Sequence, residues 1–125
     1  MRILIVDDAA LERVLLARIA VRCGHEVAGH AADVAAAVQL ATRLAPDLIV
    51  LDGRLPPAGA LDAIETLRQA APGASVAVIA GLEELDLVRA ARERGAAGAL
   101  RRPLLASQVA ATLAELQPPG SRAIE

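Results

Sequence analysis

Three aspartates follow two short runs of branched apolar residues, and together they could bind a metal ion. Asp7 and Asp8 come directly after residues 3–6, and Asp52 comes directly after residues 48–51. Carboxylates that lie close together repel one another, so such a group needs a cation. Mg²⁺ fits best, because it prefers oxygen ligands and is usually held by one or two carboxylates with water and phosphate oxygens. With a metal bound, one carboxylate could also act as a nucleophile toward a phosphoryl group.

Whether the three aspartates lie close together depends on the secondary-structure elements that carry them. Each apolar run is short and is followed by polar residues or turn formers, which is typical of a strand buried on both faces of a parallel sheet. Gly53, Pro56 and Pro57 follow Asp52 closely and end the second of these strands. Open α/β sheets bind their ligands at the carboxyl ends of the strands. We therefore expect the three aspartates at one edge of a sheet.

Strand and helix patterns alternate along the chain. Strands are expected at residues 3–6, 25–28, 48–51, 75–80 and 97–100. Helices are expected from Leu11 to a stop at Gly24, at residues 32–44, 60–70 and 85–94, and from Pro103, in a first turn, to about Leu116. The residues expected to face the core are Leu11, Val14, Leu15 and Ile19 in the first helix, and Leu105, Val109, Leu113 and Leu116 in the last.

This alternation predicts an α/β fold with helices on both faces of a parallel sheet. The economical choice is a flavodoxin-like, doubly wound (βα)5 three-layer sandwich with strand order 2-1-3-4-5. In that order the first and third strands are neighbours, so Asp7, Asp8 and Asp52 converge. We expect one domain over residues 1–117, followed by a flexible C-terminal tail over residues 118–125, which is rich in Pro, Gly and Ser.

Composition narrows the classes of function. The net charge of −2 gives no electrostatic basis for binding nucleic acid or an anionic membrane surface. Cys23 is the only cysteine, no signal-peptide pattern is present, and no apolar stretch is long enough to span a bilayer. We therefore expect a cytoplasmic protein. Aromatic residues are absent, and all 13 basic residues are arginine.

The chain resembles the receiver domain of two-component response regulators, the CheY-like superfamily. The resemblance rests on Asp7-Asp8 after the first strand, Asp52 followed by Gly53-Arg54-Leu55-Pro56, the turn at Gly95-Ala96, and Arg101-Arg102-Pro103 before the last helix. It covers essentially the whole chain up to the tail.

The resemblance implies a role for each of these residues. Asp52 would be the phosphoacceptor, taking the phosphoryl group from a phosphohistidine of a histidine kinase or phosphotransfer protein. Asp7, Asp8 and Asp52 would hold Mg²⁺, with Asp8 a direct ligand, and the main-chain carbonyl of Arg54 would complete the protein ligands. Such a domain is not an enzyme beyond self-catalysed phosphotransfer and autodephosphorylation.

The sequence departs from the family pattern at three positions. Ala80 stands where the family has Thr or Ser, Arg102 stands where it has Lys, and Ala99 stands where it has an aromatic switch residue. Arg102 keeps the charge for a phosphate contact but is longer and planar. The lost hydroxyl at Ala80 removes one hydrogen bond to a charged group, worth about 1.5–3 kcal/mol.

Two functions follow from these features. The first is a Mg²⁺-dependent receiver of a phosphorelay with a degenerate switch, which signals through a protein partner. The alternative is a pseudo-receiver, a protein-interaction module that works without phosphorylation. The family's usual partner or homodimer surface is formed by the fourth helix, the fifth strand and the last helix. No nucleic acid or membrane partner is expected within this chain.

Overall fold

Five parallel strands and five helices alternate along the described part of the chain. The computed structural model describes residues 1–56 and 59–117, so Pro57 and the predicted tail at 118–125 lie outside the described residues. The elements are β1 (Arg2–Val6), α1 (Ala10–Arg22), β2 (Glu26–Ala31), α2 (Val34–Leu44), β3 (Leu48–Asp52), α3 (Leu61–Ala70), β4 (Ser75–Gly81), α4 (Leu85–Glu93), β5 (Gly98–Arg102) and α5 (Ala106–Leu116).

The strand order is β2-β1-β3-β4-β5, as the sequence predicts. In the parallel register of β1 and β3, Ile3 lies beside Leu48 and Val6 lies beside Leu51. Because these neighbours end at the same edge, the residue after Val6 and the residue after Leu51 come close in space. The fold therefore places Asp7 and Asp52 next to each other.

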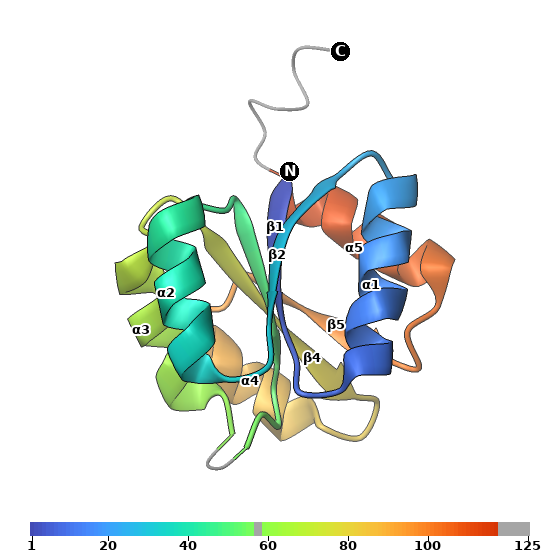
Figure 1. The fold of residues 1–125 in the computed structure, drawn as a ribbon. Coiled ribbons are helices and arrows are strands. Elements are labelled where there is room, and N and C mark those ends of the chain that lie inside the picture. The colour runs from blue at the N-terminus through green and yellow to red at the C-terminus, as the bar shows by residue number, and fades with distance from the viewer. Residues whose placement is uncertain (57–58, 118–125) are drawn as a thin grey trace.

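The sheet lies between two layers of helices (Figure 1). Helices α1 and α5 cover one face, while α2, α3 and α4 cover the other. Strand side chains alternate between the two faces, so Leu4 and Val6 belong to one apolar cluster and Ile3 and Ile5 to the other. Alanines such as Ala37 and Ala41 of α2 are fully buried, which lets the helix approach the sheet closely. No described helix is long and apolar enough to cross a membrane.

The inward face predicted for α1 is largely wrong. Ile19 is buried as predicted, but its buried companions are Leu16 and Ala20. The other residues of the predicted face are exposed, namely Leu11, Val14 and Leu15. Apolar residues surround most of this helix, so spacing alone did not select the face that meets the sheet.

The start of the last helix is also predicted wrongly. Helix α5 begins at Ala106, so Pro103 lies in the loop before it, and the Arg102–Pro103 peptide bond is cis. Leu105, predicted to face inward, is about half exposed, whereas Val109 and Leu113 are buried as predicted. Strand β5 extends through Arg102, two residues beyond the predicted end. This extension brings the Arg102 side chain to the edge of the sheet.

Gly53 follows β3 at a point where the chain has no room for a side chain. Its N–H donates to the carbonyl oxygen of Ile79 at 3.0 Å. A Cβ atom at this position would lie 2.9 Å from that same oxygen and 2.7 Å from Cδ2 of Leu87. The turn after Asp52 therefore depends on glycine for close contact with β4 and α4.

We predict that Gly53→Ala lowers the free energy of unfolding by about 1–3 kcal/mol, because backbone or Leu87 must shift to admit the methyl group. Urea denaturation of both proteins measures the difference. Gly73→Ala is the matched control, since a Cβ there meets no atom within 4 Å. Equal effects of the two substitutions would contradict the close contact described for Gly53.

Candidate functional site

Asp7 is a buried carboxylate at the end of β1. Its side chain is 0% exposed, and its N–H donates to the carbonyl oxygen of Ala31 at 3.0 Å. One carboxylate oxygen, Oδ1, accepts a hydrogen bond from the N–H of Ala9 at 2.9 Å. The other, Oδ2, is buried and has no hydrogen-bond partner among the described residues. A buried oxygen without a donor is costly, so Asp7 has one ligand atom free for a cation.

Asp52 is the last residue of β3 and is only 5% exposed. Its Oδ1 accepts a hydrogen bond from the N–H of Arg54 at 3.0 Å and another from Nη2 of Arg102 at 3.1 Å. These donors fix the plane of the carboxylate. Both donors bind Oδ1, so Oδ2 of Asp52 accepts neither of these two hydrogen bonds.

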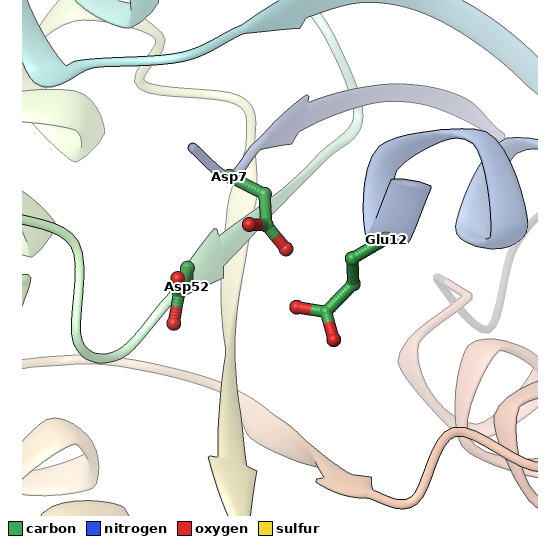
Figure 2. A group of neighbouring side chains, drawn as sticks. All are labelled: Asp7, Glu12 and Asp52. Atoms are coloured by element: carbon green, nitrogen blue, oxygen red, sulfur yellow. The ribbon is translucent and has the colours of Figure 1, made fainter. Parts of the chain in front are cut away.

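Glu12 is a third carboxylate at this position, and it was not predicted from the sequence. Asp7, Glu12 and Asp52 each offer one oxygen to a group whose atoms lie within 4.8 Å of one another. Their side chains come from the end of β1, the first turn of α1 and the end of β3, and they face a common space (Figure 2). The available signal was the position of Glu12 in the first turn of a helix that begins two residues after Asp8.

The other predicted metal ligands lie around this group. Asp8 is exposed and does not belong to the group of three. Arg54 lies in the turn after Asp52, with its N–H on the Asp52 carboxylate and its side chain paired with Glu84. The structure thus brings Asp7 and Asp52 together, leaves Asp8 at the surface, and adds Glu12.

Arg102 reaches the group from the end of β5. Its Nε and Nη2 bind the two carboxylate oxygens of Glu12 at 3.0 and 2.7 Å, and Nη2 also contacts Asp52. The side chain of Arg102 is 31% exposed and that of Glu12 is 18% exposed, so the pair is mostly enclosed. The structure thus places Arg102, the predicted phosphate contact, beside Asp52, and its pairing with Glu12 was not predicted from the sequence.

The pKa values of Asp7, Glu12 and Arg102 depend on burial and on the contacts among these residues. Burial, the neighbouring Glu12 carboxyl and the charge of Asp52 together raise the pKa of Asp7 to about 7. Burial also raises the pKa of Glu12, but the hydrogen bonds and charge of Arg102, together with the neighbouring Asp7 carboxyl, outweigh burial and leave this pKa below its usual range. The hydrogen bond to Glu12 raises the pKa of Arg102 further, so the guanidinium stays charged.

These residues fit a Mg²⁺ ion. Glu12 and Asp52 are paired with the Arg102 guanidinium, and Arg13 Nη1 donates to the main-chain carbonyl oxygen of Asp7 at 2.6 Å, so the three carboxylates still outnumber the guanidinium groups at the site. The buried, unpartnered Oδ2 of Asp7 is a ligand atom of the hard type that Mg²⁺ prefers. The group can therefore bind a divalent cation and present a carboxylate beside it.

Two of the positions that depart from the family pattern lie in β4 and β5. Ala80 is fully buried near the end of β4, beside Arg101 of β5, and Ala99 is partly buried in β5. The loop after β4 is held by other groups. Glu84 accepts a hydrogen bond from the N–H of Gly81 at 2.7 Å, and Arg101 donates to the carbonyl oxygens of Gly81 and Leu82.

Comparison with known proteins gives consistent matches. The family profile of the response regulator receiver domain matches residues 3–114. The chain is 34% identical over 112 residues to the chemotaxis protein CheY of Thermotoga maritima, covering 90% of this chain and 93% of that protein. It is 34% identical over 110 residues to the transcriptional regulatory protein PdtaR of Mycobacterium tuberculosis, covering 86% of this chain and 52% of that longer protein.

Solved structures give the same result. The receiver domain of NtrX from Brucella abortus superposes with a TM-score of 0.82 at 27% identity, covering 91% of this chain and 96% of that one. The response regulator domain of CheB from Thermotoga maritima superposes with a TM-score of 0.78 at 29% identity, covering 92% of this chain and 91% of that one.

We predict that Asp7→Asn stabilises the metal-free protein at pH 8, by about 1–3 kcal/mol, because the amide removes a buried negative charge and can donate to Glu12. In the folded state the pKa of Asp7 is about 7, whereas its ordinary value is 3.8. The folded protein therefore keeps the Asp7 proton to a higher pH than the unfolded chain does. This group therefore makes the parent lose stability as the pH rises from about 4 to about 7.

Denaturation in a chelating buffer at several pH values measures this difference. The stability gain from Asp7→Asn should be largest at pH 8 and should shrink toward pH 4. Asp8→Asn is the matched control, because the same charge change at an exposed residue should have little effect. A gain that does not depend on pH would contradict the burial of an ionisable carboxyl at Asp7.

Proposed function

This chain belongs to the family of response regulator receiver domains, and we propose that it accepts a phosphoryl group on Asp52 in a Mg²⁺-dependent phosphorelay. Receiver domains act in two-component signalling, where they interact with histidine kinases and downstream effector proteins. The observation that carries the proposal is the geometry of Asp52. It ends β3 beside the buried Asp7, with a guanidinium on one of its two carboxylate oxygens.

Asp52 Oδ2 is the proposed nucleophile. The hydrogen bonds from Arg54 and Arg102 both reach Oδ1 and hold the carboxylate in one orientation. Oδ2 would attack the phosphorus of a phosphohistidine, forming an oxygen–phosphorus bond as the nitrogen–phosphorus bond breaks. The bonding electron pair returns to the imidazole nitrogen, which then takes up a proton. Hydrolysis of the aspartyl phosphate by water restores Asp52 and releases inorganic phosphate.

Asp7 and Asp52 would hold Mg²⁺, together with the Arg54 main-chain carbonyl and with Asp8 or Glu12 from the surrounding turn. Bound there, Mg²⁺ would neutralise negative charge on the transferring phosphoryl group. Arg102 would supply the positive charge that a lysine provides in the family. Its guanidinium already contacts Asp52, and it can bind phosphate oxygens with two parallel N–H groups.

The proposed output route differs from the family's usual one. Ala80 has no hydroxyl to bind the phosphoryl group, and Ala99 has no aromatic ring that could change its position in response. The contacts that hold the loop after β4 are instead ionic and carbonyl contacts from Glu84, Arg54 and Arg101. We propose that the surface of α4, β5 and α5 binds the downstream protein or a second copy of the chain, because this loop and Arg101 join the site to that surface.

The protein that delivers the phosphoryl group must reach Asp52, and α1 begins at the edge of the site. Leu11 is 86% exposed, and Val14 and Leu15 are about half exposed on the same helix. Exposed apolar groups that lie together often mark protein-binding surfaces. We therefore assign this part of α1 to the contact with the histidine-bearing partner, in a cytoplasmic setting like that of CheY-type proteins.

A second candidate function is a pseudo-receiver that signals without phosphorylation. The buried Ala80 and the partly buried Ala99 favour it, because both remove groups that read the phosphoryl state. In that case residues 1–117 would form an interaction domain whose partner binding does not depend on Asp52. The two candidates differ in whether an aspartyl phosphate forms.

We predict that incubation with Mg²⁺ and acetyl phosphate adds one phosphoryl group to the protein, measured by intact mass. The modification should be lost on alkaline hydroxylamine treatment, as an acyl phosphate requires. Asp52→Asn should stay unmodified, and chelation of Mg²⁺ should suppress the reaction in the parent. Absence of the adduct in the Mg²⁺-saturated parent would favour the pseudo-receiver instead.

We further predict that Ala80→Ser tightens the binding of beryllofluoride, a phosphoryl analogue, by about tenfold or more. The serine hydroxyl restores a hydrogen bond to a charged group, worth about 1.5–3 kcal/mol. Titration followed by amide NMR measures the affinity. Ala77→Ser, equally buried but nearer the start of β4, is the matched control and should not change it. No gain at position 80 would mean that the phosphoryl group does not face Ala80.

A further inference from the structure

The Arg102–Glu12 pair joins two elements that are distant in sequence across the phosphoacceptor. Arg102 ends β5, and Glu12 lies in the first turn of α1. Two hydrogen bonds of 3.0 and 2.7 Å connect Nε and Nη2 of Arg102 to the two oxygens of Glu12. The same Nη2 lies 3.1 Å from Asp52. The guanidinium is thus shared between a helix and the reacting carboxylate.

Enclosure sets the two ion pairs of Arg102, with Glu12 and with Asp52, apart from the other ion pairs of the described residues. The Arg89–Asp86 side chains are 73% and 99% exposed, and such pairs contribute little because water screens them. The Arg102 and Glu12 side chains are 31% and 18% exposed. Two parallel hydrogen bonds in a partly enclosed position make a strong and directional contact. Breaking it without a replacement would leave charged groups poorly solvated.

A phosphoryl group on Asp52 would be such a replacement. The two N–H groups that bind the Glu12 carboxylate have the geometry that also suits two phosphate oxygens. A phosphoryl group would carry more negative charge than the carboxylate and would lie on the residue that Arg102 already contacts. Glu12 and the phosphoryl group would therefore compete for the same guanidinium. A lysine at position 102 could not form this two-bond contact with either of them.

We propose that Glu12 is a positioning residue that holds Arg102 beside Asp52 in the unphosphorylated protein. When Asp52 is phosphorylated, Arg102 leaves Glu12 and binds the phosphoryl group. This inference rests on the proposed function of Asp52. Until phosphorylation occurs, the Glu12 carboxylate occupies the N–H groups of Arg102 that would otherwise bind the phosphoryl group. The exchange frees Glu12 from Arg102 and so changes the first turn of α1.

The exchange has a measurable consequence for anion affinity. Because the Glu12–Arg102 contact must be lost, it weakens the binding of any phosphoryl analogue. Glu12→Gln, which keeps the size of the side chain, should bind beryllofluoride about tenfold more tightly than the parent at saturating Mg²⁺. Glu26→Gln is the matched control, since it removes an exposed pairing with Arg2 far from Asp52 and should leave the affinity unchanged.

A double-mutant cycle separates competition for Arg102 from simple charge repulsion. In an Arg102→Gln background, Glu12→Gln should change beryllofluoride affinity by less than about threefold, because no guanidinium remains to be released. An equal gain in both backgrounds would mean that Glu12 only repels the anion. A loss of affinity in Glu12→Gln would mean that Glu12 assists the bound state. Either result would overturn the inference.

The Arg102 Nε–H resonance gives a second readout that needs no ligand. In the metal-free parent this resonance should be resolved and protected from solvent, and Glu12→Gln should abolish the protection. Beryllofluoride with Mg²⁺ should shift it in the parent and change the amide signals around Glu12. A parent that fails to bind beryllofluoride would defeat the proposed function and this inference together. Binding without any dependence on Glu12 would defeat this inference alone.

Discussion

The burial of carboxylates at the edge between β1 and β3 is the constraint on which the site depends. The strand order places Asp7 beside Asp52, and the first turn of α1 adds Glu12. The oxygens of this group lie within 4.8 Å of one another, and only one guanidinium, that of Arg102, is paired with them among the described residues. Such a group is stable when a proton or a cation compensates its charge. The raised pKa of Asp7 shows the first response, and Mg²⁺ binding would be the second.

If Asp52 is phosphorylated as proposed, Arg102 and Glu12 would set the balance between the resting and phosphorylated states of this receiver domain. A lysine would provide a point charge, whereas the arginine forms two parallel hydrogen bonds and so can be held by a carboxylate. Glu12 provides that carboxylate from α1. The positions that usually read the phosphoryl state are alanines, at 80 and 99. A conformational change on phosphorylation would therefore pass through the ionic contacts of the site rather than through β4. These contacts reach α1 and the loop after β4.

The fold and the position of Asp7 beside Asp52 were predictable from the sequence because both depend on strong local patterns. Uninterrupted branched residues marked β1 and β3, and the aspartates after them marked one edge of the sheet. The orientation of α1 could not be predicted, since apolar residues lie on both sides of this helix: Leu11 and Leu15 are exposed, whereas Leu16 is buried. Glu12 was missed because its role depends on the angle at which α1 leaves the sheet. The contact between Arg102 and Glu12 spans ninety positions and has no local signal.

The most direct measurement is a crystal structure of the protein with Mg²⁺ and beryllofluoride. Asp52 as phosphoacceptor requires the beryllium on Oδ2 of Asp52, the metal between Asp7 and Asp52, and the Arg102 guanidinium turned from Glu12 toward fluorine atoms. A structure at saturating concentrations in which Asp52 carries no beryllofluoride, and Arg102 remains on Glu12, would contradict the assignment of Asp52 as the phosphoacceptor.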